Sequence, residues 1–239
     1  MPHDLVVERD WRILTIVFDR PDARNALDRQ TRVALVERLQ HAEEDGTIRV
    51  VILTGTDPAF SSGIDIKELR GDADYVPPPI DPATQARRMT TPTIAAVNGA
   101  CVTGALEIML GCSMAIASER AIFADTHTKV GLTPGWGLSA HLPAAIGHAR
   151  ANQLSLTGTP IDAVTALAWG LVNEVVAHDE LLPRARELAA QIVAIPARSV
   201  RRTLTLARDG RDLTLDPLRE LERDVLRAGR AATERSTDV

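Results

Sequence analysis

Two short segments of the chain contain glycine turns, and the second also contains a residue capable of acid/base chemistry. The first contains Ser62-Gly63-Ile64 and the second Thr103-Gly104, and each joins an apolar strand pattern to the start of a helix pattern. The N–H groups in the first turn of a helix have no partner within the helix and carry a partial positive charge. If the two turns face each other, their N–H groups supply two donors for a developing oxyanion such as a thioester enolate. The alternative is that both glycines merely permit tight turns.

Glu107 is the candidate acid/base residue of the second segment. It is the lone charged residue in the apolar stretch 105–110. Burying a carboxylate in such surroundings is costly without a role or a partner, and burial raises the pKa of a carboxyl group toward the range useful for proton transfer. A structural salt bridge is the alternative role for this glutamate.

Composition restricts the class of protein. The chain has 239 residues, 45% of them hydrophobic, which is enough for one large domain with a substantial core. Its net charge of −5 gives no general attraction to nucleic acid or to an anionic membrane, so we expect neither as a partner. Cys101 and Cys112 show no metal-ligand spacing, so the sequence predicts no metal site and two small core residues in a reducing compartment.

The N-terminal residues have neither the basic region nor the apolar region of a secretion signal, so we expect a cytoplasmic protein. The most apolar window, 93–117, is interrupted by Asn98, Glu107 and several glycines. A bilayer would resist these interruptions. The window therefore predicts a buried strand, a turn and a helix.

The elements that must position these residues follow an α/β pattern. Alternating residues predict a β-hairpin from 5–8 and 13–18, and Asp28 caps a predicted helix over 29–44. Apolar runs predict strands at 49–55, 93–97, 114–118 and 121–123, with a helix at 104–112. Beyond 139, one strand at 172–176 is predicted among helices at 141–146, 149–156, 162–169, 180–194, 197–208 and 215–230.

The stretch from Gly71 to Pro82 predicts an irregular, exposed loop. It carries Asp72, Asp74 and the Pro77-Pro78-Pro79 run, which is incompatible with regular structure. A lid beside the site and a plain surface insertion are both compatible with this composition.

Four ordered motifs resemble the enoyl-CoA hydratase/isomerase (crotonase) superfamily over nearly the whole chain. They are Arg20-Pro21 with Asn25-Ala26-Leu27, the run 60–69, the run 98–107, and 131–135. The resemblance implies a crotonase-like ββα spiral of the ClpP/crotonase fold, in residues 1–178, that carries the CoA-thioester site. It also implies a C-terminal helical region, 179–239, that builds a homotrimer or homohexamer.

The resemblance also implies roles for individual residues. The two oxyanion-hole N–H groups map onto Ile64 and Gly104, and Glu107 keeps the position of the first catalytic glutamate. Trp136 would close the acyl end of the pocket, with core packing as the alternative. Arg24 would meet a CoA phosphate or be a solvated surface residue. The adenine and pantetheine track would be lined by Ser61, Ser62, Gly63, Asp65 and Ile66.

His127 occupies the position where the family's hydratases have a second glutamate. Histidine carries a proton near neutral pH, so His127 could act as a general acid, oriented by Asp125 or a nearby hydroxyl. A non-catalytic pocket residue is the alternative.

The sequence therefore predicts a 2-trans-enoyl-CoA hydratase. Glu107 would activate water, and His127, or water held by it, would protonate the α-carbon. The substrate would be an acyl-CoA thioester, and no separate cofactor would be needed. An isomerase using Glu107 as its single base, a catalytically weak acyl-CoA binding protein, and a hydrolase or decarboxylase on the same scaffold are the alternatives.

Overall fold

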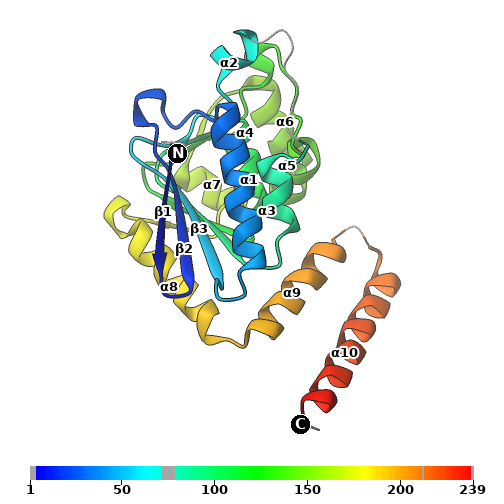
Figure 1. Cartoon of the computed structure of the whole chain (residues 1–239). Coiled ribbons are helices and arrows are strands. Elements are labelled where there is room, and N and C mark those ends of the chain that lie inside the picture. Colours follow the sequence, from blue (N-terminus) through cyan, green and yellow to red (C-terminus); the bar gives the residue numbers. More distant parts are fainter. Residues whose placement is uncertain (1–3, 72–78, 212, 238–239) are drawn as a thin grey trace. The chain divides into compact units, whose positions relative to one another are not determined.

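The computed structural model describes residues 4–71, 79–211 and 213–237. These residues form two compact units, Met1–Ala194 and Ile195–Val239, whose elements are shown in Figure 1. Residues 72–78, which make up most of the loop predicted at 71–82, lie outside the described residues. No helix in the described part of the chain is both long and apolar enough to cross a membrane.

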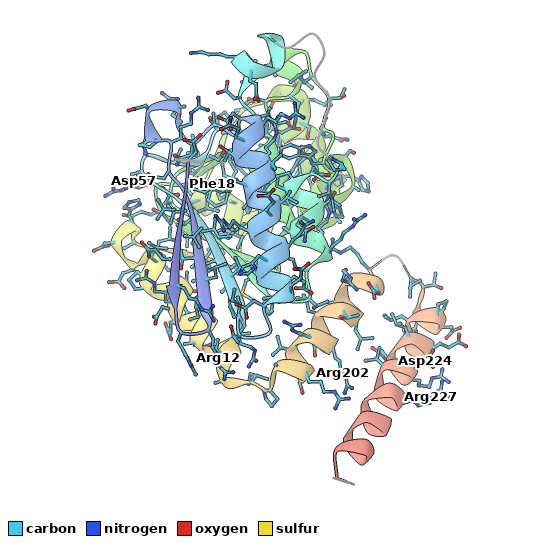
Figure 2. All side chains as sticks on the ribbon, viewed as in Figure 1. Arg12, Phe18, Asp57, Arg202, Asp224 and Arg227 are labelled. Atoms are coloured by element: carbon cyan, nitrogen blue, oxygen red, sulfur yellow. The ribbon has the colours of Figure 1, made fainter. Side chains whose placement is uncertain are left out.

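The larger sheet of the first unit has six strands in the order β1-β2-β3-β5-β7-β10. β1 (Leu5–Asp10) and β2 (Ile13–Phe18) form the predicted antiparallel hairpin. Arg12 lies at its turn and Phe18 at the far end of β2 (Figure 2). The other strands are parallel: β3 (Val50–Gly55), β5 (Thr93–Val97), β7 (Met114–Ser118) and β10 (Glu174–Val176).

Helices cover both faces of this sheet, as the continuous apolar strands require. Val51 and Leu53 of β3 pack on one face with Leu35 and Leu39 of α1 (Arg29–Glu44). Alternate residues of the same strand, such as Ile52, pack on the other face against α8 (Leu181–Ala194). Figure 1 shows these two helices on either side of the strands.

A second, smaller sheet has the order β4-β6-β8-β9. β4 (Ala59–Ser61), β6 (Ala100–Val102) and β8 (Ile122–Ala124) are parallel, and β9 (Ile161–Asp162) runs antiparallel to β8. The chain passes three times from the larger sheet to the smaller one, through β3-β4, β5-β6 and β7-β8, and each pair is followed by a helix. The predicted succession of ββα turns is therefore present.

The remaining helices lie close to their predicted bounds, except for the last, which runs over Leu215–Thr237 rather than 215–230. Near the site, one helix begins earlier than predicted and one was not predicted. α5 begins at Leu138 rather than His141, and a helix at Pro82–Arg88, capped by the Asp81 side chain, was not predicted. The helices of the first unit not yet given are α2 (Ile66–Gly71), α3 (Pro82–Arg88), α4 (Gly104–Gly111), α5 (Leu138–Ile146), α6 (His148–Thr157) and α7 (Ala163–Trp169), with short 3-10 turns η1 (Pro21–Ala23), η2 (Thr128–Val130) and η3 (His178–Glu180).

The first compact unit ends at Ala194. The sequence placed this boundary at residue 178, sixteen residues earlier. The reason is α8, whose residues Leu181, Ala185 and Ala189 are buried in the cluster against the larger sheet. The second unit contains α9 (Ala197–Asp209) and α10 (Leu215–Thr237), which contact each other. The role of this helical region in oligomerisation stays a prediction.

One buried amide joins the loop after β2 to the loop before β4. Asn25 has a positive φ of 56° and is 1% exposed. Its Oδ1 accepts the N–H of Arg20 at 2.9 Å, and its Nδ2 donates to the carbonyls of Thr56 at 2.8 Å and Ala59 at 2.6 Å. These bonds hold the start of β4, and therefore the Gly63 turn that follows it.

We expect Asn25→Ala to lower the free energy of unfolding by about 2–4 kcal/mol, because it leaves several buried polar groups without partners. Urea denaturation monitored by circular dichroism measures this change. Arg24→Ala is the matched control, since Arg24 also has positive φ but is exposed, and it should change stability by less than about 1 kcal/mol. Equal losses in the two variants would contradict the proposed role of the amide.

Candidate active site

The first glycine turn contains a backbone N–H, that of Ile64, which finds no acceptor in the part of the chain that the structure describes. Gly63 has a φ of 86°, and Leu27 forms a parallel bridge with Ile64. In that bridge, Leu27 donates to the carbonyl of Gly63 at 2.8 Å and accepts from the N–H of Asp65 at 3.1 Å. The N–H of Ile64 itself therefore points away from Leu27, and it has no acceptor among the described residues.

The second turn lies directly against the first. A Cβ built on Gly63 would be 2.1 Å from Thr103 Oγ1 and 3.2 Å from the backbone nitrogen of Gly104, so only glycine fits there. Gly104 is the first residue of α4, and a Cβ on it would be 2.8 Å from the ring of Trp136 and 3.3 Å from the Ile64 side chain. The structure thus brings together the two turns in which the sequence predicted an oxyanion hole.

Thr103 has a backbone conformation that the sequence did not reveal. Its φ of 49° and ψ of −113° are suited to glycine and strained for a β-branched residue. Such strain costs about 1–3 kcal/mol and is concentrated at functional sites. Since Thr103 immediately precedes Gly104, its conformation sets the direction of the Gly104 N–H.

We expect Thr103→Gly to raise the free energy of unfolding by about 1 kcal/mol, because relief of strain exceeds the added entropy of the unfolded chain. Thermal and urea unfolding measure the change. Thr103→Ala is the matched control, because it removes the hydroxyl group but keeps Cβ, and it should give no such gain. A less stable glycine variant would show that the turn is not strained.

Glu107 is held at the centre of the site by backbone donors. It lies one turn after Gly104 on α4 and is 1% exposed. Its Oε1 accepts the N–H groups of Trp136 at 2.8 Å and Leu138 at 3.1 Å. Burial raises the pKa of Glu107, the nearby charge of Asp81 adds to this rise, and the two N–H groups and His127 partly oppose it. The carboxyl group therefore has the raised pKa that proton transfer near neutral pH favours.

His127 lies opposite Glu107, where β8 leads into η2. The ring is 5% exposed, and its Nδ1 lies 2.6 Å from Oδ1 of Asp125. Its Nε2 lies 3.9 Å from Oε2 of Glu107. This distance is too long for a direct hydrogen bond. The two atoms are therefore placed to contact one small molecule, such as a water, at the same time.

The residues predicted to line a CoA track divide into two groups. Ser61 is fully buried, and its hydroxyl binds the carbonyl of Asn25 at 2.7 Å and the N–H of Gly63 at 3.1 Å, so it positions the turn rather than lining a track. Asp65 pairs with Arg20 at 2.9 Å and accepts the N–H of Lys67 at 3.0 Å.

The second group has surface left for a ligand. Arg24, Ser62, Ile66 and Trp136 are each at least partly exposed.

Two residues that support the site were missed from the sequence. Arg87 of α3 donates to the carbonyl of Trp136 at 2.6 Å, which anchors the turn whose N–H groups hold Glu107. Asp81 contributes its charge to the environment of Glu107. Both lie in or next to the helix 82–88 that was not predicted. No local motif connects Arg87 to Trp136, 49 positions later, or Asp81 to Glu107, 26 positions later. Only the three-dimensional contact identifies them.

Comparisons with known proteins agree with this geometry. The family model for enoyl-CoA hydratase/isomerase matches residues 8–236. A probable peroxisomal enoyl-CoA hydratase 1 of Arabidopsis thaliana is 36% identical over 214 residues, covering 89% of this chain and 81% of the relative. The fold and site define a crotonase-type α/β protein. The chain belongs to the enoyl-CoA hydratase/isomerase family.

Solved structures confirm the predicted fold class. A crystal structure of an enoyl-CoA hydratase from Mycobacterium avium has a TM-score of 0.80 and 41% identity, covering 99% of this chain and all of that one. An enoyl-CoA hydratase structure from Geobacillus kaustophilus has a TM-score of 0.89 and 29% identity, covering 98% and 92% of the two chains. The crotonase-like ββα spiral with C-terminal helices is therefore the fold of this chain.

We expect Glu107→Gln to stabilise the protein at pH 7 by on the order of 1 kcal/mol, because it removes a buried ionisable group while Oε1 still accepts both N–H groups. The folded-state pKa of Glu107 lies above its ordinary value of 4.5, so wild type loses stability as pH rises from that value through the folded-state pKa. The gain from Glu107→Gln should therefore disappear below about pH 4.5. Thermal unfolding from about pH 4 to about pH 8 measures it, and a pH-independent gain would contradict this origin.

Proposed function

We propose that the protein is a 2-trans-enoyl-CoA hydratase. The observation that carries this proposal is the pair formed by Glu107 Oε2 and His127 Nε2, two proton-carrying groups 3.9 Å apart beside the two glycine turns. Hydration requires a base for water and an acid for carbon within reach of one substrate. Family membership and relatives named as enoyl-CoA hydratases support the same activity.

In the proposed mechanism, the thioester oxygen accepts hydrogen bonds from the N–H groups of Ile64 and Gly104. Glu107 takes a proton from water as its oxygen bonds to the β-carbon, and the electron pair of the double bond moves into the enolate. His127, or water held by it, then protonates the α-carbon. One oxyanion donor of this type contributes roughly 3 to 4 kcal/mol to transition-state stabilisation. The reaction adds the elements of water across the double bond with no net oxidation or reduction, so CoA enters only as part of the substrate.

We further propose that the acyl-CoA thioester follows the exposed side of the first turn. Ser62 and Ile66 would contact the pantetheine, Arg24 a phosphate, and Trp136 the acyl end. Gly63 is buried and would act by permitting the turn. Ser61 and Asp65 would act indirectly by holding this turn in place, as their hydrogen bonds suggest. The homotrimer or homohexamer and the cytoplasmic location stay predictions, and sedimentation analysis checks the first of them.

Activity is tested by following the loss of the conjugated thioester absorbance of crotonyl-CoA and of a longer trans-2-enoyl-CoA. We expect wild type to hydrate at least one of them, with kcat lowered by roughly 10²- to 10⁴-fold in Glu107→Gln and in His127→Ala. The exposed residues Glu119 and His148 provide matched controls, Glu119→Gln and His148→Ala, that should retain activity.

Reaction in H₂¹⁸O distinguishes the alternatives. A hydratase incorporates one solvent oxygen into the product, whereas an isomerase moves the double bond without incorporation. Tight binding of acyl-CoA with no turnover of either enoyl-CoA would overturn the proposal and favour a binding protein. Full activity in His127→Ala would show that His127 is a non-catalytic pocket residue.

A further inference from the structure

We propose that Asp125 is a positioning residue that holds the His127 ring in one orientation and one tautomer, with Nδ1 protonated and Nε2 presented to the reacting groups. This inference rests on the proposed function, because Nε2 matters only if His127 transfers a proton. It adds a third buried titratable residue to the site and assigns it a role through His127.

The contacts of Asp125 fix both the backbone and the ring of His127. A single oxygen, Oδ1, accepts the N–H of His127 at 3.2 Å and lies 2.6 Å from Nδ1 of the same residue. The first bond closes a turn of the kind that aspartate commonly makes with a residue two positions on. The second bond is not needed for that turn. The ring is therefore held by an interaction separate from the local backbone geometry.

The chemistry of the two groups determines the tautomer. An ionised carboxylate can only accept hydrogen bonds, so the nitrogen facing it must carry a proton. In a neutral imidazole the other nitrogen then has the free lone pair. Here that nitrogen is Nε2, which faces Glu107 Oε2 at 3.9 Å. His127 gives a proton to the α-carbon from Nε2 as the imidazolium, and the Nδ1–H tautomer remains. The proton that Glu107 took from water then restores the imidazolium.

Burying the Asp125 carboxylate costs free energy of folding, and a role in positioning His127 explains why it is present here. It is 1% exposed, and among the described residues its Oδ2 accepts no hydrogen bond of ordinary geometry. Burial opposes ionisation, but the hydrogen bond from His127 and the nearby Ser155 hydroxyl keep the pKa of Asp125 below its ordinary value. The group is therefore a buried carboxylate with one strong partner, and that partner is the histidine.

The need for this partner follows from the shape of imidazole. A carboxyl group presents two equivalent oxygens, so a glutamate in this position works whichever oxygen faces the substrate. An imidazole rotated by half a turn exchanges nitrogen for carbon and loses the proton-carrying atom. A histidine in this position therefore requires a fixed orientation, which the bond to Asp125 supplies.

Asp125→Asn tests the role, because the substitution keeps the shape but replaces the charged acceptor by a neutral amide. The amide oxygen accepts the Nδ1 proton more weakly, and the amide nitrogen, where it faces Nδ1, favours the other tautomer. We expect kcat for enoyl-CoA hydration to fall about 10- to 100-fold, as is typical when the partner that orients a functional histidine is lost. Binding of the unreactive butyryl-CoA should change by less than about twofold, because Asp125 does not contact the substrate. Thermal unfolding checks that the variant is folded.

A double-mutant cycle separates positioning from general structure. In a His127→Ala background, Asp125→Asn should have no further effect on the residual rate, because the residue that it positions is absent. An equal loss of rate in both backgrounds would overturn the proposal and assign Asp125 to the turn alone.

Nuclear magnetic resonance of protein with ¹⁵N-labelled histidine rings gives a readout independent of activity. The His127 signals are identified by their absence in His127→Ala. We expect the neutral ring to be the Nδ1–H tautomer in wild type and a mixture of tautomers in Asp125→Asn. An Nε2–H tautomer in wild type would overturn the inference even if hydratase activity is present. The expected tautomer with no hydratase activity would instead refute the proposed function and leave the Asp125–His127 contact intact.

Discussion

The close approach of two backbone turns is the constraint on which the site depends. Gly63 and Gly104 lie so near each other, and so near Thr103 and Trp136, that a side chain at either glycine would collide with its neighbours. The two turns follow adjacent strands of the smaller sheet, β4 and β6, which fixes their relative position. The proposed oxyanion hole takes its two N–H groups from these turns, without any side chain taking part. Sheet geometry, rather than side-chain choice, creates the proposed oxyanion hole.

The proposed acid/base residues are held in a different way, in which each buried titratable group has one atom fixed and another left available. In Glu107 the backbone holds Oε1, and Oε2 faces the site. In His127 a carboxylate faces Nδ1, and Nε2 faces Glu107. Fixing one end of each group provides orientation, and the unpaired end retains its capacity for proton transfer. A fully satisfied network would be more stable but could not do chemistry.

The sequence was most informative where local pattern and tertiary structure agree. The helix at 29–44 and the strands at 93–97 and 114–118 are present with the predicted bounds because each has a strong apolar pattern and clear end signals. The strands at 59–61, 100–102 and 161–162 are too short to show a period, although the glycine turns marked the first two. Ser61 was expected to line a ligand track, yet it is fully buried, because the whole of β4 is covered and the Ser61 hydroxyl is engaged by the backbone of Asn25 and Gly63.

The least predictable features of the site are contacts between residues distant in sequence. Glu107 is held by N–H groups about thirty positions later, and Arg87 supports that turn from about fifty positions earlier. Neither relation leaves a local motif. Asp125 and His127, in contrast, are two positions apart, so their contact could be suspected from sequence, but not which ring nitrogen it engages. Replacing a symmetric carboxyl group by an asymmetric ring makes that nitrogen decisive, and a buried neighbouring carboxylate is the simplest physical means of selecting it.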